Sequence, residues 1–159
     1  MCIRDRGIDS TFLSAFAKSQ IACGTILPSK GKVFISIDDD NKKFILTIIK
    51  KLIDLNFRVV ATKGTAKFLN DNNLKVETIN KVKEGGSHIV RAIAENLIDL
   101  VINTTKTQGS IRDSYSIRRT SLTFSIPYYT TIAGAKVAVD TIEHLKNNNL
   151  KVKSLQDIN

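Results

Sequence analysis

The sequence predicts an α/β fold in which a five-stranded parallel sheet is flanked by helices on both faces. The main observation is that five short, strongly apolar segments alternate with longer segments whose apolar residues recur at helical spacing. Strands that are apolar along their length are typical of parallel sheets covered on both faces. The second observation is the length of 159 residues, which suits one compact domain with a short appendage.

The predicted strands are short runs rich in valine and isoleucine, and a segment with helical features follows each of them. The strands lie at residues 33–37, 58–61, 76–79, 100–103 and 127–130. The helices are expected at residues 41–56, 64–72, 88–95, from Ser110 onward, and at 133–148. The segment Ser110-Ile111-Arg112-Asp113 predicts a helix start, because a serine side chain can cap the amide three residues further on.

The first 31 residues stand apart from this alternation. Residues 1–6 have neither periodicity nor a motif, and we expect them to be a non-native leader. Residues 10–22 predict a helix with one apolar face, and Gly24 is typical of a helix stop. We expect residues 7–31 to be a leader helix and linker from a preceding domain, and residues 32–159 to form the main domain. An uncovered leader helix would favour self-association into a homo-oligomer.

Composition and charge exclude several classes of protein. The chain is 42% hydrophobic and 25% charged, has no apolar run long enough for a membrane span, and has no signal-peptide pattern. Cys2 and Cys23 alone build neither a disulfide framework nor a structural zinc site, so we expect a cytoplasmic protein. The net charge of +9 suggests nucleic-acid binding, but no basic run is interleaved with aromatic residues. Small anionic ligands are the favoured interpretation, and a basic nucleic-acid-binding domain is an alternative.

Polar residues follow the carboxyl ends of the predicted strands, where ligands bind in open parallel sheets. Thr62 and Thr65 flank Gly64 at the start of a predicted helix, whose N-terminal amides favour an anion. Lys42 and Lys81 follow neighbouring strands. The sequence therefore predicts a phosphate site. The alternative is that the threonines only cap the helix and the lysines are solvated.

Catalytic and metal-binding residues are scarce. We expect His88 to be structural or a neutral donor at a helix start, and His144 to face solvent. Three adjacent acids, 38–40, are expected to favour the positive end of the next helix rather than to bind a cation. The glycine patterns of nucleotide-binding loops are missing. Binding without turnover, with no catalytic residue and no metal, is the function that the residues favour.

Six motifs in order carry a family resemblance: SIDDDNK, VATKGTA, INKVKEGGSHI, LVINTT, IRDSYSIRR and YYTT. Together they resemble the regulatory C-terminal domain of carbamoyl phosphate synthase large chains, which has the methylglyoxal synthase-like fold, a three-layer sandwich. The resemblance implies that the chain is a piece of an ATP-dependent, glutamine-hydrolysing ligase of pyrimidine and arginine biosynthesis. The parent would use ATP and Mg, whereas this piece would be non-catalytic alone and need no cofactor. The implied partners are the catalytic part of the large chain and the glutaminase small subunit.

The resemblance also implies a nucleotide monophosphate effector, uridylate or inosinate, lying across the strand ends. The residues implied to hold its phosphate are Lys42, Thr62, Thr65 and Lys81. Asn103 and Thr105 would complete the pocket, and Thr130 matches a threonine that contacts ornithine in bacterial relatives. Lys63 stands where relatives often have histidine, and Gly86-Ser87 where they often have arginine-proline, which leaves the choice of effector open.

A lyase of the same fold, methylglyoxal synthase, is the alternative function. It carries a Gly-Gly-Asp turn and an Asp-Pro pair, where this sequence reads Gly85-Gly86-Ser87 and Asn103-Thr104-Thr105. Without either carboxylate the lyase would lack its general base. The inosinate-forming enzyme of purine synthesis, which also has this fold, is a more distant alternative.

Overall fold

The sheet of the computed structural model contains five parallel strands in the order β3-β2-β1-β4-β5. Residues 7–80, 88–104 and 108–150 are described, with the backbone alone for residues 108–113. The strands are β1 (Gly31–Ser36), β2 (Phe57–Thr62), β3 (Glu77–Ile79), β4 (Leu100–Asn103) and β5 (Tyr128–Tyr129). The predicted parallel sheet is confirmed. Its outer strands are shorter than expected, because β3 and β5 each pair with a single neighbour.

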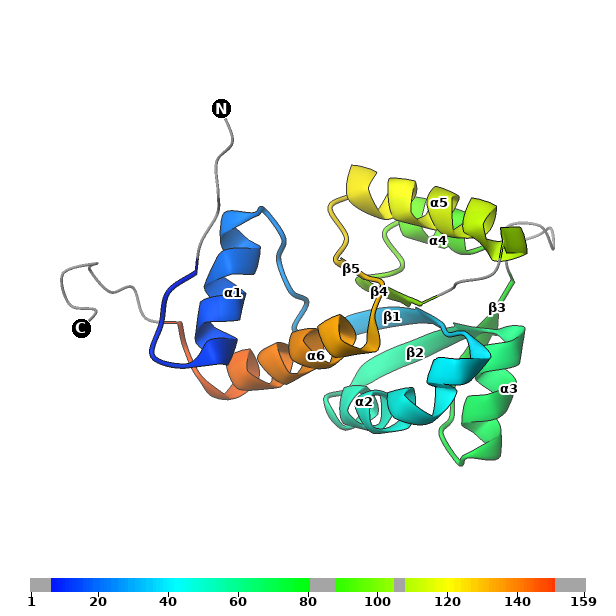
Figure 1. Cartoon of the computed structure of the whole chain (residues 1–159), viewed down its shortest axis with the longest axis horizontal. Helices are drawn as coiled ribbons and strands as arrows, with labels where there is room; N and C mark the ends of the chain where they lie inside the picture. The colour runs from blue at the N-terminus through cyan, green and yellow to red at the C-terminus, as the bar shows by residue number, and fades with distance from the viewer. Residues whose placement is uncertain (1–6, 81–87, 105–107, 151–159) are drawn as a thin grey trace.

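Helices cover both faces of the sheet, so the chain forms three layers (Figure 1). The helices are α1 (Phe12–Ala22), α2 (Lys42–Asp54), α3 (Lys63–Asp71), α4 (Ile89–Ala94), α5 (Gln108–Thr123) and α6 (Ile132–Asn147), with a short 3-10 turn, η1 (Asp39–Asn41). Helices α2, α3 and α6 pack on one face, and α4 and α5 on the other. This arrangement confirms the predicted sandwich. None of the helices in the described ranges is long and apolar enough to cross a lipid bilayer.

The central strand β1 explains why the apolar runs predicted the core. Val33 and Ile35 belong to the cluster under α2, α3 and α6, while Phe34 points to the opposite cluster under α4 and α5. All three side chains are fully buried. Because successive side chains of a strand point to opposite faces, a strand with apolar residues at every position requires cover on both sides.

Helix α5 begins earlier than expected. The backbone is already helical at Gln108, so Ser110 lies inside the first turn and is not the capping residue. A capping serine has non-helical backbone angles, which a residue inside the helix does not adopt. The predicted start at Ser110 is therefore wrong by two residues.

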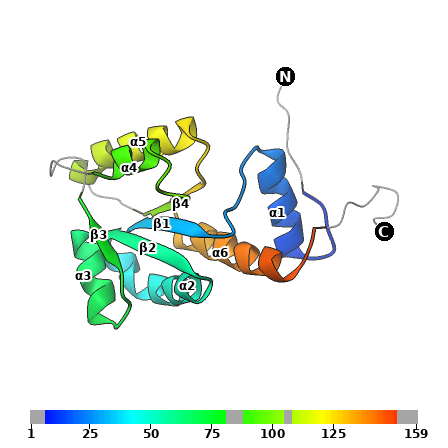
Figure 2. The ribbon, with the colours of Figure 1, turned by 180° about the vertical axis from the view of Figure 1, so that it is seen from behind.

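Helix α1 lies beside α6, away from the sheet, in both views of the ribbon (Figures 1 and 2). His144 of α6, expected to face solvent, is half-buried, and its Nε2 lies 2.9 Å from the Ser14 Oγ of α1. That expectation is wrong, because the partner of His144 comes from a segment 130 residues away in the chain. Phe12 and Ile21 of α1 are 68% and 53% exposed.

Candidate functional site

The junction of β2 and α3 places Thr62 and Thr65 in contact. The Thr62 Oγ1 donates to the Thr65 Oγ1 at 3.3 Å, and the Thr65 Oγ1 accepts from the Ile37 backbone N–H at 3.2 Å. Both threonines are buried, with 5% and 1% of their surfaces exposed. The Thr65 hydroxyl therefore ties the first turn of α3 to the end of β1.

Helix α3 begins at Lys63, directly after the end of β2. Thr62 is the residue before the helix, and its side chain makes no capping hydrogen bond. A Cβ added at Gly64 would meet no atom of the described residues within 4 Å, apart from the backbone of its own turn. Uncapped N–H groups at a helix N-terminus carry partial positive charge, which is the setting in which proteins bind phosphate.

Lys42 reaches the same region from the start of α2. Its Nζ lies 2.5 Å from the Asp39 Oδ1 and 5.8 Å from the ring centroid of Phe68, a residue of α3. The ammonium group of Lys42 holds the pKa of the Asp39 carboxyl below its usual value. Lys42 thus lies beside α3, with its amino group directed to an acid of its own turn.

A second region, which we call the β5 cleft, opens past β4 and β5. It has a volume of ≈ 480 Å³, and its lining includes Asn41, Asn103, Ser114, Arg118, Tyr128 and Thr130. The Asn103 Nδ2 donates to the Ser114 Oγ at 3.2 Å and to the Tyr128 hydroxyl at 3.0 Å. Burial raises the pKa of Tyr128, and the hydrogen bond from Asn103 partly opposes that shift. No ion pair among the described residues involves Arg118.

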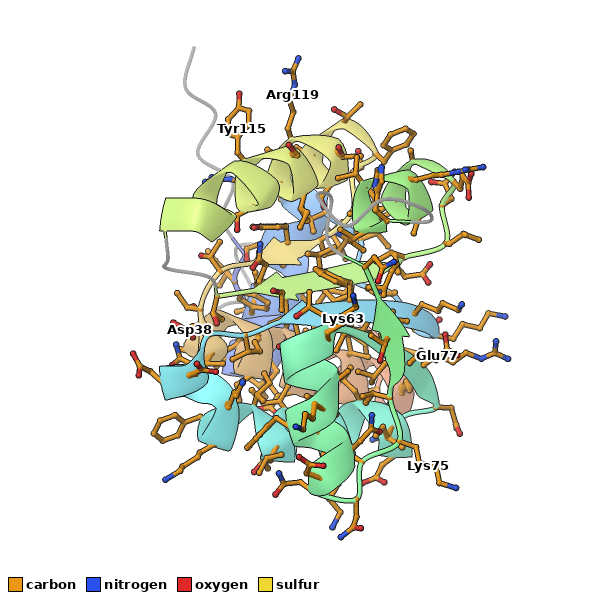
Figure 3. All side chains as sticks on the ribbon, turned by 90° about the vertical axis from the view of Figure 1, so that its right-hand side faces the viewer. Asp38, Lys63, Lys75, Glu77, Tyr115 and Arg119 are labelled. Carbon is orange, nitrogen blue, oxygen red and sulfur yellow. The ribbon has the colours of Figure 1, made fainter. Side chains whose placement is uncertain are left out.

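Asp38 joins the segments that follow β1 and β4, at Asn41 and Thr104, and both of these residues line the β5 cleft. Its Oδ1 accepts from the Asn41 Nδ2 at 2.6 Å and from the Thr104 Oγ1 at 3.0 Å. Asp38 lies between the end of β1 and the start of η1. It is on the same side of the sheet as Lys63, the first residue of α3 (Figure 3). Asp38 precedes η1 without a capping hydrogen bond from its side chain, and Asp39 and Asp40 lie in the first turn, so the expectation that the three acids favour the helix end stays a prediction.

The predicted site residues therefore divide between two places. Thr62 and Thr65 lie together at the start of α3 and Lys42 lies beside the same helix at Phe68, whereas Asn103 and Thr130 line the β5 cleft. The predicted Lys81 and Thr105, and the turn 85–87, lie outside the described residues.

Sequence reasoning missed Ser114, Arg118 and Tyr128. Ser114 and Arg118 are four residues apart in the IRDSYSIRR motif, so both project from one side of α5. That spacing could have identified them, but nothing in the sequence showed that α5 faces the end of β5.

The two remaining polar predictions concern His88 and metals. His88 precedes α4, and its Nδ1 accepts from the Arg91 backbone N–H at 3.4 Å. This contact is the structural role that the sequence suggested, and the alternative of a donor at the other ring nitrogen stays a prediction. Among the described residues, no group of three or more His, Cys, Asp or Glu side chains could hold a metal ion.

Comparison with known proteins identifies the family. The MGS-like domain model matches residues 44–130, more than half of the chain. The carbamoyl phosphate synthase large chain of Mesorhizobium japonicum is 45% identical over 95% of this chain and 13% of its own length, and that of Rhizobium meliloti is 46% identical over 94% and 13%. The carbamoyl phosphate synthase large chain, C-terminal section, of Methanopyrus kandleri is 45% identical over 96% of this chain and 28% of its own length.

These matches agree with the resemblance that the six ordered motifs predicted. The chain spans 13% of the length of the two bacterial relatives and 28% of the archaeal one, so the similarity concerns one part of those proteins. The chain belongs to the MGS-like domain family, and its curated relatives are carbamoyl phosphate synthase large chains.

Proposed function

We propose that the chain acts as the nucleotide-effector-binding regulatory domain of a glutamine-dependent carbamoyl phosphate synthase large chain, in pyrimidine and arginine biosynthesis. The proposed effector is uridylate or inosinate. The chain itself carries out no chemical step, and the ligase reaction, with its ATP and Mg, belongs to the catalytic part of the large chain. That catalytic part and the glutaminase small subunit are the proposed partners.

The observation that carries the proposal is the uncapped start of α3 with Lys42 beside it. Thr62 does not cap this turn, a Cβ added at Gly64 would meet no atom of the described residues outside the turn, and the Thr62–Thr65 hydrogen bond orders the turn. A phosphate monoester would accept hydrogen bonds from these amides and from the Lys42 amino group. In this proposal the hydroxyl of Thr65 positions the turn, because it is already bonded to β1.

The rest of the effector is proposed to extend toward Asn103, the last residue of β4, which lines the β5 cleft. Lys81 and Thr105 remain in the proposed set of contacts through the family resemblance. Thr130, exposed at the far side of the cleft, is the proposed contact to ornithine at the border with the catalytic part. Regulation then requires that the effector binds two conformations of the large chain with unequal affinity.

Calorimetry with uridylate and with inosinate tests the effector site on the chain as it is. Lys42→Ala should weaken binding by roughly 1–3 kcal/mol, because it removes a charge-assisted hydrogen bond. Lys43→Ala is the matched control, since Lys43 is the exposed neighbour on the same helix. Absence of heat at millimolar nucleotide would contradict the proposal, and equal losses in both variants would remove Lys42 from the site.

An assay for methylglyoxal formation from dihydroxyacetone phosphate separates this function from the lyase alternative. We expect no turnover, because neither Gly85-Gly86-Ser87 nor Asn103-Thr104-Thr105, which stand where the lyase has its two carboxylates, contains an acid. Robust turnover would replace the regulatory proposal by the lyase.

A further inference from the structure

The Lys42 amino group is directed to Asp39 and not to the start of α3. The Nζ to Oδ1 distance is 2.5 Å, within the range of a charge-assisted hydrogen bond. The Lys42 side chain is 19% exposed and packs over the Phe68 ring, so its position is restricted on two sides. Phe68 lies about one helical turn after Thr65, which puts the amino group beside α3 and below its N-terminal amides.

Asp39 competes with any phosphate for the same cation. A phosphate at the α3 amides needs the Lys42 amino group to leave the carboxylate, and the free carboxylate then repels the phosphate. The Asp39 side chain is 91% exposed, and exposed ion pairs are weak and easily exchanged. The contact therefore opposes anion binding without preventing it.

We propose that Asp39 is an internal competitor that lowers the affinity of the α3 phosphate site by holding Lys42. The inference rests on the proposed function, because it describes how that same site is tuned. Its consequence is a gain of affinity when the acid is removed, which a merely structural role of Asp39 would not produce.

Calorimetry with uridylate and with inorganic phosphate tests the competition. Asp39→Asn should tighten binding of both probes by about two- to fivefold, the range expected for loss of one exposed ion pair. Asp40→Asn is the matched control, because it removes the same charge from the same turn. None of the ion pairs in the described ranges involves Asp40, so a change below about 1.5-fold is expected.

A double-mutant cycle with Lys42→Ala separates competition for the cation from simple repulsion. In the Lys42→Ala background, Asp39→Asn should give a clearly smaller gain, since the contested cation is gone and only the repulsion between the carboxylate and the phosphate is relieved. A gain of equal size in that background, or equal gains in Asp39→Asn and Asp40→Asn, would overturn the inference and leave the proposed function standing. If neither the original chain nor Asp39→Asn binds either probe at millimolar concentration, the proposed function fails and the inference fails with it.

Discussion

The two regions at the strand ends differ in how their polar groups are used. At the start of α3 the threonine hydroxyls are buried and bonded within the protein, Thr62 does not cap the helix, and the amino group of the nearby Lys42 contacts Asp39. In the β5 cleft the side chains themselves line a volume of ≈ 480 Å³, and the described lining residues include a cation, Arg118, and no acid. The first region suits a compact anion, whereas the second accommodates a larger polar group.

Thr65→Val gives the largest effect that we expect on stability. The substitution keeps the shape but removes the acceptor of the buried Ile37 N–H, which should lower the free energy of unfolding by about 1–3 kcal/mol. Urea unfolding measures it. Thr130→Val is the control, because Thr130 is exposed in the cleft and its hydroxyl makes no such tie. If both variants lost the same free energy of unfolding, the hydroxyl at the start of α3 would be no more important for stability than the one in the β5 cleft.

Asp38→Ala tests whether Asp38 holds the segments after β1 and β4 together. It removes the acceptor shared by Asn41 and Thr104, so the segments after β1 and β4 should loosen together, at a cost of about 1–2 kcal/mol in unfolding free energy. Amide hydrogen exchange at Asn41 and at Thr104 should become faster in the same variant.

Asp38→Asn serves as the conservative partner of that variant, because an amide oxygen can still accept from both donors. We expect it to restore most of the protection from exchange. If Asp38→Ala loosened one segment and left the other unchanged, the two segments would be stabilised independently of each other.

Asn103→Ala should change the titration of Tyr128. The Asn103 amide donates to the phenol oxygen and favours the phenolate, which partly opposes the upward shift that burial causes. Removing the amide should therefore raise the pKa of Tyr128 further. An NMR titration of the Tyr128 ring measures the shift, with Tyr115, which is exposed on α5, as the internal reference (Figure 3). A downward shift would show that the hydrogen bond does not form.

Arg118→Ala is expected to have the smallest effect. Because Arg118 has no ion-pair partner among the described residues, its loss should change the free energy of unfolding by less than about 0.5 kcal/mol. Inorganic phosphate should bind this variant as it binds the original chain, while Lys42→Ala weakens it. Weaker phosphate binding in Arg118→Ala would move the anion site from α3 to the β5 cleft.

Much of the fold was predictable because it follows from local pattern. Alternating apolar strands and amphipathic helices require a covered parallel sheet, and the strand at 100–103 was predicted with its observed bounds. The predictions were wrong where a residue has a partner far away in the chain, and where a short motif fits both a helix start and a helix interior. His144 looked like a polar surface residue until α1 placed Ser14 against it, and Ser110 fitted a capping pattern inside a helix that starts at Gln108.

For the candidate site, the residue types could be predicted from position after each strand, but their roles could not. Thr65 was predicted as a phosphate ligand, and its hydroxyl is bonded to β1. Lys42 was predicted beside it, and its amino group contacts Asp39. A sequence shows which polar groups reach an edge of the sheet. It does not show which of these groups form hydrogen bonds with one another, because their pairing depends on how several elements pack.

The order of apolar and polar residues along this chain determined by itself that a parallel sheet lies between helices, since each strand must bury both of its faces. The succession of motifs determined the family. Only the tertiary structure decided that Thr62 and Thr65 turn inward, that Asp38 bridges two strand ends, and that α5 and β5 enclose a cleft. Hydrogen bonds between residues far apart in the chain form according to distance and direction in space, which local sequence does not specify.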